Sequence, residues 1–167
     1  MKNLVAYYTY TGNTEVVAKE IQQLAGGELA KIEEVKKRKP NAMMGPAFSA
    51  LIGLRSRLKP MDFSLKGYDN IFLCAQVWAG HSTPAINSFL GKADFKGKKV
   101  FLFMTRADEK TTQVVIDSIT ARIEKRGGKV VDCISLTTKW KELLTSEAVN
   151  EPVSEWIRKT GIVKEST

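Results

Sequence analysis

The chain has 167 residues, of which 43% are hydrophobic and 26% are charged. This length predicts one domain over residues 1–167, and the composition indicates a globular protein rather than a disordered one. The net charge of +8 leaves several partners open: nucleic acid, an anionic membrane surface, or an acidic protein. It is equally typical of a lysine-coated soluble protein with no such partner.

Disulfide and metal chemistry are disfavoured. Cys74 and Cys133 lie far apart and form no C-x-x-C pair, and His81 is the only histidine. The longest apolar runs fall short of the roughly 18 residues that a membrane-spanning helix needs. The apolar run at the N-terminus is also too short for a signal-peptide core. We therefore expect a soluble cytoplasmic protein without a membrane span.

Apolar runs alternate with helical patterns along the chain. Leu4 to Tyr8 predicts a strand buried on both faces, and the helical spacing that follows it ends at Gly26-Gly27. Thr83-Pro84 opens a later helix, because threonine is a good cap and proline suits the first turn. We expect strands at 2–8, 28–35 (an edge strand), 70–77, 99–104 and 129–136, and helices around 17–25, 84–90, 115–123 and 146–159. This alternation predicts an α/β fold, a doubly wound parallel sheet covered on both faces. The strand order 2-1-3-4-5 fits, and the pattern alone also leaves a Rossmann order open.

Residues 36–60 interrupt the alternation. They contain Lys36-Lys37-Arg38-Lys39 and then Met43, Met44, Phe48, Leu51, Ile52 and Leu54, interleaved with Arg55, Arg57 and Lys59. We expect a loop followed by a short amphipathic helix. That helix is either the ordinary second crossover helix with a solvated basic face, or a basic flap or docking patch for an acidic partner.

The loop after the first strand reads Thr9-Tyr10-Thr11-Gly12-Asn13-Thr14. Parallel sheets bind ligands beyond the carboxyl ends of their strands, and Gly12 permits a tight turn there. The backbone amides of residues 10–14 can converge on an anion at the helix N-terminus, helped by threonine hydroxyls and the Asn13 amide. The loop carries no lysine or arginine, so it would hold a phosphate monoester without a cation. It matches neither G-x-G-x-x-G nor G-K-[ST], which disfavours a dinucleotide or ATP. The alternative is a threonine-rich cap that binds nothing.

The loop resembles the [ST]-x-T-G-N-T phosphate loop of flavodoxins, and the element order resembles that family from Met1 to about Gly161. The resemblance implies a three-layer, flavodoxin-like fold with a five-stranded sheet of order 2-1-3-4-5. It also implies FMN as the cofactor and another redox protein as the partner. The basic charge is a departure, because flavodoxins are usually acidic.

By the same resemblance, two more loops complete the site. In Val77-Trp78-Ala79-Gly80-His81, Trp78 would flank the isoalloxazine ring, Gly80 could let a peptide reorient toward flavin N5, and His81 could reach the flavin edge. The alternatives are a core or rim tryptophan and an ordinary loop histidine. The loop from Thr105 to Lys110 departs from the family, because it lacks both a tyrosine and a glycine-rich turn. Arg106 could lie beside the ring there, with Thr105 and Asp108 as further candidate contacts.

Three functions follow from these patterns. Electron transfer through FMN is the leading hypothesis, with a redox protein, acidic in the simplest case, as partner. An FMN-dependent NAD(P)H oxidoreductase acting on quinones is the nearest rival, because the short third loop could leave one flavin face open. The third is a non-redox binding module that docks through the basic segment 36–59. Nucleic-acid binding has only the charge in its favour. A basic shell should also make the semiquinone/hydroquinone potential less negative than in an acidic flavodoxin.

Overall fold

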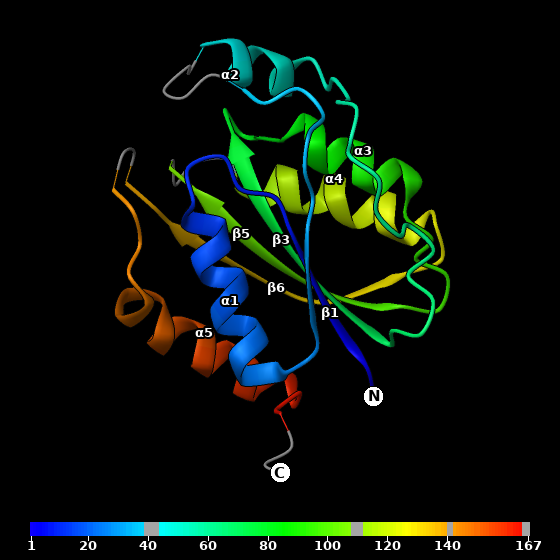
Figure 1. Cartoon of the computed structure of the whole chain (residues 1–167), viewed down its shortest axis with the longest axis vertical. Coiled ribbons are helices and arrows are strands. Elements are labelled where there is room, and N and C mark those ends of the chain that lie inside the picture. The colour runs from blue at the N-terminus through cyan, green and yellow to red at the C-terminus, as the bar shows by residue number, and fades with distance from the viewer. Residues whose placement is uncertain (39–43, 108–111, 140–141, 165–167) are drawn as a thin grey trace.

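The computed structural model describes residues 1–38, 44–107, 112–139 and 142–164. A sheet forms the middle layer, and helices cover both of its faces (Figure 1). The strands are β1 (Asn3–Tyr7), β2 (Glu28–Lys31), β3 (Asn70–Trp78), β4 (His81–Ser82), β5 (Lys99–Arg106) and β6 (Lys129–Thr137). The helices are α1 (Asn13–Ala25), α2 (Met44–Leu51), α3 (Pro84–Lys92), α4 (Thr112–Glu124) and α5 (Ser146–Thr160).

The sheet has the order β2-β1-β3-β5-β6, with all neighbouring strands parallel, and β4 pairs antiparallel with the end of β3. Counting the parallel strands alone, this is the predicted order 2-1-3-4-5, so the predicted fold class is confirmed. Both faces of β1 are buried, because its apolar run packs against helices on either side. The edge strand β2 is mostly exposed and ends at Lys31, four residues earlier than predicted.

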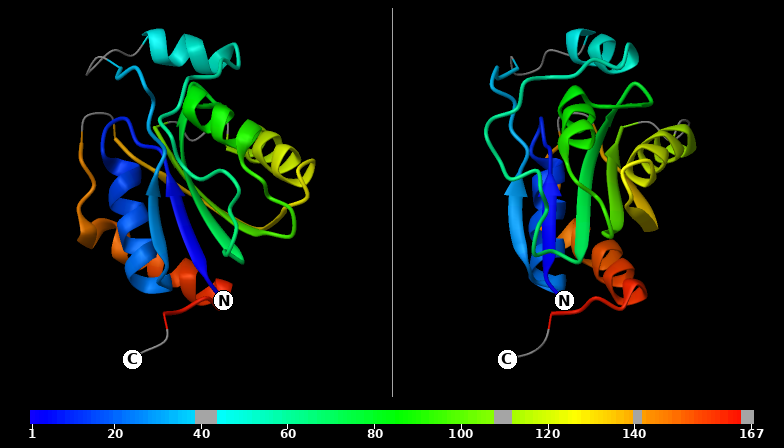
Figure 2. Two further views of the ribbon diagram at one scale, coloured as in Figure 1. Left: turned by 45° about the vertical axis from the view of Figure 1, so that its right-hand side comes forward. Right: turned by 90° about the vertical axis from the view of Figure 1, so that its right-hand side faces the viewer.

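Two apolar cores lie on opposite faces of the sheet. Helices α1 and α5 cover one face, and α3 and α4 cover the other (Figure 2). On the first face Trp156 of α5 packs edge-on against Phe72 and Phe103, with ring centroids 5.9 and 5.5 Å apart. On the second, Phe89 packs edge-on against Phe95. Burial of each such ring contributes about 1.5–3 kcal/mol, so these layers hold the strand ends in fixed positions.

Helix α2 does not pack on a face of the sheet. Both views place it over the carboxyl ends of the strands (Figures 1 and 2). The predicted short helix is therefore present, but the prediction that it is the ordinary second crossover helix is wrong. Residues 52–69 occupy that position instead, because Leu58 and Leu65 from this segment are buried in the core on the α3 face. Phe48 and Leu51 of α2 remain 61% and 55% exposed. Among the described residues, no helix is long and apolar enough to cross a membrane.

Candidate functional site

The loop from Thr9 to Thr14 joins β1 to α1 at the carboxyl edge of the sheet. Gly12 is the N-cap of α1 and has a φ of 104°, in the left-handed region that side chains disfavour. A Cβ atom at this position would lie 2.8 Å from Cδ1 of Leu143. The backbone conformation therefore favours glycine at the point where the loop turns into the helix, and a larger residue would also displace the Leu143 side chain.

Three backbone amides of this loop are unpaired within the described part of the chain. The Tyr10 amide donates to Oε1 of Gln76 at 2.9 Å, and the Gly12 amide donates to Oγ1 of Thr9 at 2.9 Å. The amides of Thr11, Asn13 and Thr14 have no protein acceptor among the described residues. The expectation that all five amides of residues 10–14 converge on an anion is thus wrong for Tyr10 and Gly12. The other three lie at a helix N-terminus, where backbone dipoles favour negative charge.

Most polar side chains of the loop form hydrogen bonds that hold the loop in place. The Asn13 amide group donates to the Glu142 carbonyl at 3.0 Å and accepts from the Leu144 amide at 2.8 Å. The Thr14 hydroxyl pairs with the Thr105 hydroxyl at 2.7 Å, and both residues are almost fully buried. Asn13 and Thr14 therefore tie the loop to neighbouring segments, and the Thr11 hydroxyl is the one that stands exposed.

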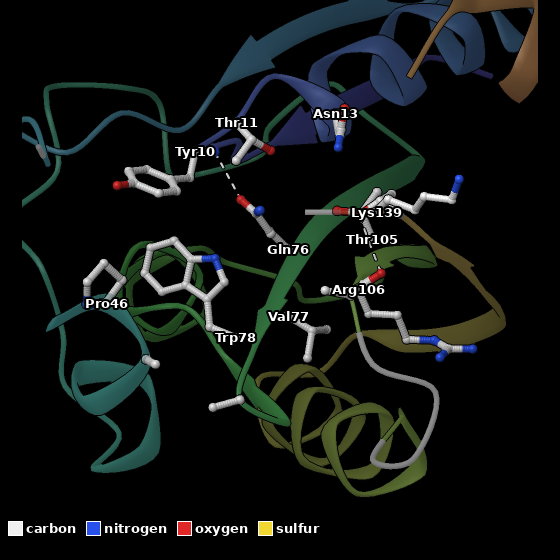
Figure 3. A pocket seen from close by; sticks show the side chains of 14 residues that line it. Tyr10, Thr11, Asn13, Pro46, Gln76, Val77, Trp78, Thr105, Arg106 and Lys139 are labelled. Carbon is white, nitrogen blue, oxygen red and sulfur yellow. Dashed lines mark hydrogen bonds between the residues drawn. The ribbon is translucent and has the colours of Figure 1, made fainter. Parts of the chain in front are cut away.

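A cavity of about 120 Å³ lies beside this loop, between the ends of β1, β3 and β5 (Figure 3). It brings together eight of the predicted site residues: Tyr10, Thr11, Asn13, Val77, Trp78, Ala79, Thr105 and Arg106. Thr9, Gly12 and Thr14 lie in the adjoining loop. Gly80 and His81 line a different cavity, and Asp108 lies outside the described residues.

Six residues that sequence reasoning did not single out also line the site cavity. They are Pro46 and Ala47 from α2, Gln76 from β3, Ala107 after β5, and Thr138 and Lys139 after β6. Lys139 adds a cationic residue to the wall of the cavity beside the loop, which has no cation in its own sequence. Its exposed Nζ lies 3.5 Å from a Glu142 carboxylate oxygen. Only the three-dimensional order of the strands places Lys139 here, because it lies far from the loop in sequence.

Comparison with solved structures identifies the architecture. A protein from Bacteroides uniformis classed as a flavoprotein superposes with a TM-score of 0.77 at 23% identity, over 94% of this chain and 97% of that one. A flavoprotein from Lactobacillus acidophilus in complex with FMN gives 0.66 at 20% identity, over 80% and 92%. Oxidised flavodoxin 1 from Bacillus cereus gives 0.57 at 19% identity, over 98% and 100%. The fold is flavodoxin-like. No family model matches the sequence, and no curated protein does.

Trp78 stands at the wall of the cavity in this flavodoxin-like fold, and its side chain is only 8% exposed. Tyr8 and Tyr10 lie edge-on to the indole, with centroids 6.0 and 5.5 Å away. The Arg38 guanidinium lies over the ring, 5.1 Å from its centroid. The indole is therefore held tightly by its neighbours, and the part of it that is open faces the cavity (Figure 3).

A buried polar network holds Arg38 in its position over the Trp78 indole. Glu34 accepts two hydrogen bonds from Arg38, both at 2.8 Å, and one from the Tyr8 hydroxyl at 2.7 Å. Burial lowers the pKa of the Arg38 guanidinium, but Glu34 outweighs that effect, so the pKa is raised overall. Burial, followed by the Glu34 hydrogen bond, also raises the pKa of Tyr8. Arg38 therefore stays charged, and a bidentate pair fixes it over Trp78.

The loop predicted after β3 is a tight hairpin. Val77 pairs with Ser82 and Trp78 pairs with His81, so Ala79 and Gly80 form a two-residue turn. Their φ angles are 46° and 73°, and two positive values are typical of a type I′ hairpin turn. A left-handed conformation is unfavourable for alanine, so the turn stores strain beside the cavity. It also directs Gly80 and His81 away from the cavity that Ala79 lines.

Thr105 and Arg106 were predicted in a loop but are the last residues of β5. The strand continues because Thr105 pairs with Gln76 on one side and Leu136 on the other. The Arg106 Nε donates to the Ser135 hydroxyl at 3.1 Å. Arg106 therefore approaches the cavity from a paired strand, on the side opposite Trp78 (Figure 3).

Proposed function

We propose that this chain binds one FMN, with its phosphate on the loop from Thr9 to Thr14. The observation that carries the proposal is the set of unpaired amides of Thr11, Asn13 and Thr14 at the N-terminus of α1. A phosphate monoester accepts hydrogen bonds from such amides, and the helix dipole adds to the attraction. The exposed Thr11 hydroxyl and the Lys139 ammonium, which borders the same cavity, supply further donors. FMN-bound structures of the same fold support the choice of this nucleotide.

The isoalloxazine ring would extend from the phosphate loop into the cavity between Trp78 and Arg106. Trp78 borders the cavity with the small open part of its indole, an apolar aromatic surface that suits contact with a flat aromatic ring. Val77 and Ala79 add apolar surface, and Gln76 and Thr138 add polar atoms at the wall. When bound, FMN would supply one- and two-electron redox chemistry, and the chain would supply binding, orientation and a basic environment.

A flavin titration with two glycine variants tests the binding proposal. Gly12→Ala introduces a Cβ 2.8 Å from Leu143 and forces a residue with φ of 104° into the phosphate loop. Gly161→Ala is the matched control, because Gly161 also caps a helix with a positive φ but has open space around it and lies at the end of α5. FMN affinity should fall at least about tenfold in Gly12→Ala, the equivalent of 1.4 kcal/mol. It should be unchanged in Gly161→Ala. Equal affinities in all three proteins would refute the phosphate position.

Electron transfer to a protein partner is the function that we favour for the bound flavin. The surface around α2 supports it and is defined by Phe48, Leu51, Ile52 and Leu54, all about half-exposed or more. An apolar patch of this kind is typical of a docking site. Lys36, Lys37 and Arg57 line the cavity next to α2, so the fitting partner is a redox protein with an acidic rim. We place this reaction in the cytoplasm, where the free thiols of Cys74 and Cys133 fit a reducing compartment.

An FMN-dependent NAD(P)H oxidoreductase is the alternative. It is favoured by the two cationic residues that border the cavity, Arg106 and Lys139, because their positive charge suits the phosphate groups of NAD(P)H. Steady-state oxidation of NAD(P)H by the FMN-loaded protein, with a quinone acceptor, separates the two. Sustained turnover assigns the enzyme, and its absence, with rapid reduction by a redox protein, assigns the carrier. A preparation that cannot take up FMN would leave the third hypothesis, a non-redox module that docks through residues 36–59.

A further inference from the structure

A second cavity, of about 310 Å³, lies on the other side of the Ala79-Gly80 turn from the proposed flavin site. Ala79 borders the first cavity and Gly80 borders the second, so one turn separates them. The second cavity is open to solvent and is bordered by the end of α2, by β4, by α3 and by α4. A cavity needs only about 10–15 Å³, measured in the same way, to hold one water molecule. A small organic group therefore fits inside it.

Two arginines and the only histidine of the chain border this cavity. Arg55 follows α2, Arg122 belongs to α4, and His81 belongs to β4. None of the described residues that line the cavity is acidic, and neither guanidinium has a carboxylate partner within the described part of the chain. Arg122 is partly buried, and its burial, together with the charge of Arg55, lowers the pKa of its guanidinium. The fold thus holds two like charges close together, which is unfavourable unless an anion joins them.

The cavity is rigidly constructed around the buried side chain of Asn87. Its amide nitrogen donates to the carbonyl of Leu54 at 2.9 Å, and its amide oxygen accepts from the Ser82 hydroxyl at 2.6 Å. Arg122 donates to the same amide oxygen and to the Asn87 carbonyl. A single side chain therefore fixes the segment before Arg55, strand β4 and helix α4 relative to one another. The position of Arg122 is determined by α3 and not by an ion pair.

Both guanidinium groups keep hydrogen-bond donors to spare. Arg122 uses two of its five N–H groups on Asn87, and Arg55 has no hydrogen-bond acceptor among the described residues. Arg55 lies against α3, with its Cζ 3.2 Å from where a Cβ of Gly91 would be. The planar forks of two arginines match the oxygens and the charge of a phosphate dianion better than the single charge of a carboxylate.

The geometry points to this cavity as a binding site for the phosphate group of a second small-molecule ligand, held by Arg55 and Arg122. His81 and Ser118 border the same cavity and complete its polar wall. This phosphate site does not need bound FMN in order to bind its own ligand. The site lies one hairpin turn from the proposed flavin cavity, so its ligand would bind next to the flavin, a relation that rests on the proposed function.

Pyrophosphate titration of the FMN-saturated protein by calorimetry tests the site, at a constant 150 mM KCl to limit non-specific attraction. FMN keeps the phosphate loop occupied. Arg55→Gln should weaken pyrophosphate binding about tenfold or more, since a hydrogen bond to a charged group contributes at least 1.4 kcal/mol. Arg122→Gln should do the same. Two results would place pyrophosphate on the loop from Thr9 to Thr14 and overturn the proposal. One is that FMN displaces pyrophosphate. The other is that Gly12→Ala weakens pyrophosphate binding whereas Arg55→Gln does not.

Arg126→Gln is the matched control. Arg126 lies four residues after Arg122, just past the end of α4, and donates to the carbonyls of Ala93 and Lys92 at the end of α3. Arg126→Gln removes the same charge and a similar contact with α3, but Arg126 does not line the cavity. Pyrophosphate affinity should be unchanged in Arg126→Gln. An equal loss in this variant, or no binding to the unsubstituted protein, would also overturn the proposal. If FMN fails to bind, pyrophosphate affinity is compared among the same variants without FMN. The FMN proposal and the pyrophosphate-site proposal can therefore fail independently of each other.

Discussion

The hydroxyl pair of Thr14 and Thr105 offers a direct test of how the phosphate loop is held. The two Oγ1 atoms lie 2.7 Å apart, and the residues are 0% and 1% exposed. Valine has nearly the same shape as threonine, so Thr105→Val removes the hydrogen bond without opening a cavity. It leaves the Thr14 hydroxyl buried without its partner, which costs about 1–3 kcal/mol. Thr14→Val should cost a similar amount for the same reason.

The double variant Thr14→Val/Thr105→Val removes both polar groups and leaves none unsatisfied. Its loss of stability should therefore be smaller than the sum of the two single losses, by about 1 kcal/mol or more. Urea unfolding of the four proteins measures this difference. For a chain of this length, 1 kcal/mol corresponds to about 2–4 °C in Tm, which thermal unfolding resolves. Additive losses would refute the reasoning, because they would mean that the two hydroxyls do not depend on each other.

Three further predictions concern the surroundings of the site. Arg38→Ala removes the cation over Trp78, so the indole should become more exposed and its fluorescence emission should shift to the red; an unchanged spectrum would contradict the packing. Cys133 should resist thiol reagents at pH 8 in the folded protein and react after unfolding, because burial, with Asp132, raises its pKa to about 12; rapid reaction in the native state would count against this. Hydrogen bonds with Lys31 lead the interactions that hold the pKa of Glu15 below its ordinary value of 4.5, so its stabilising contribution is present above pH 4.5 and lost as the pH falls through the folded value. Lys31→Met should bring the Glu15 pKa, measured by NMR, back toward 4.5, and an unmoved pKa would reject the assigned cause.

The sequence predicted most elements because their signals are local, whereas the sheet order 2-1-3-4-5 came from the resemblance to flavodoxins, since the pattern alone left a Rossmann order open. Apolar runs mark the strands, Gly26 ends α1, and Thr83-Pro84 begins α3 as predicted. The position of the loop from Thr9 to Thr14, between β1 and α1, followed from the same local signals. The Tyr10 amide was misjudged because its acceptor, Gln76, lies 66 residues away. No local pattern indicates such a pairing.

The remaining differences also come from long-range contacts. Helix α2 lies over the strand ends because the segment after it, with Leu58 and Leu65, fills the face of the sheet. Lys139 reaches the site through the parallel pairing of β5 and β6. The sequence contains one indication of the turn at Ala79-Gly80, the glycine itself. The other turn position is occupied by alanine, which is unusual with a positive φ, so the turn was not predicted. Tertiary packing thus decides which side chains border the cavity.

Titration with FMN and with riboflavin, followed by flavin fluorescence, tests the central claim most directly. Riboflavin has the same ring as FMN and lacks the phosphate, so the difference in affinity reports the contribution of the loop from Thr9 to Thr14. Hydrogen bonds to the phosphate from only two of the three unpaired amides should already favour FMN by about 100-fold or more. The account predicts one FMN per chain with that preference. Equal affinity for the two flavins, or no uptake of FMN, would contradict it.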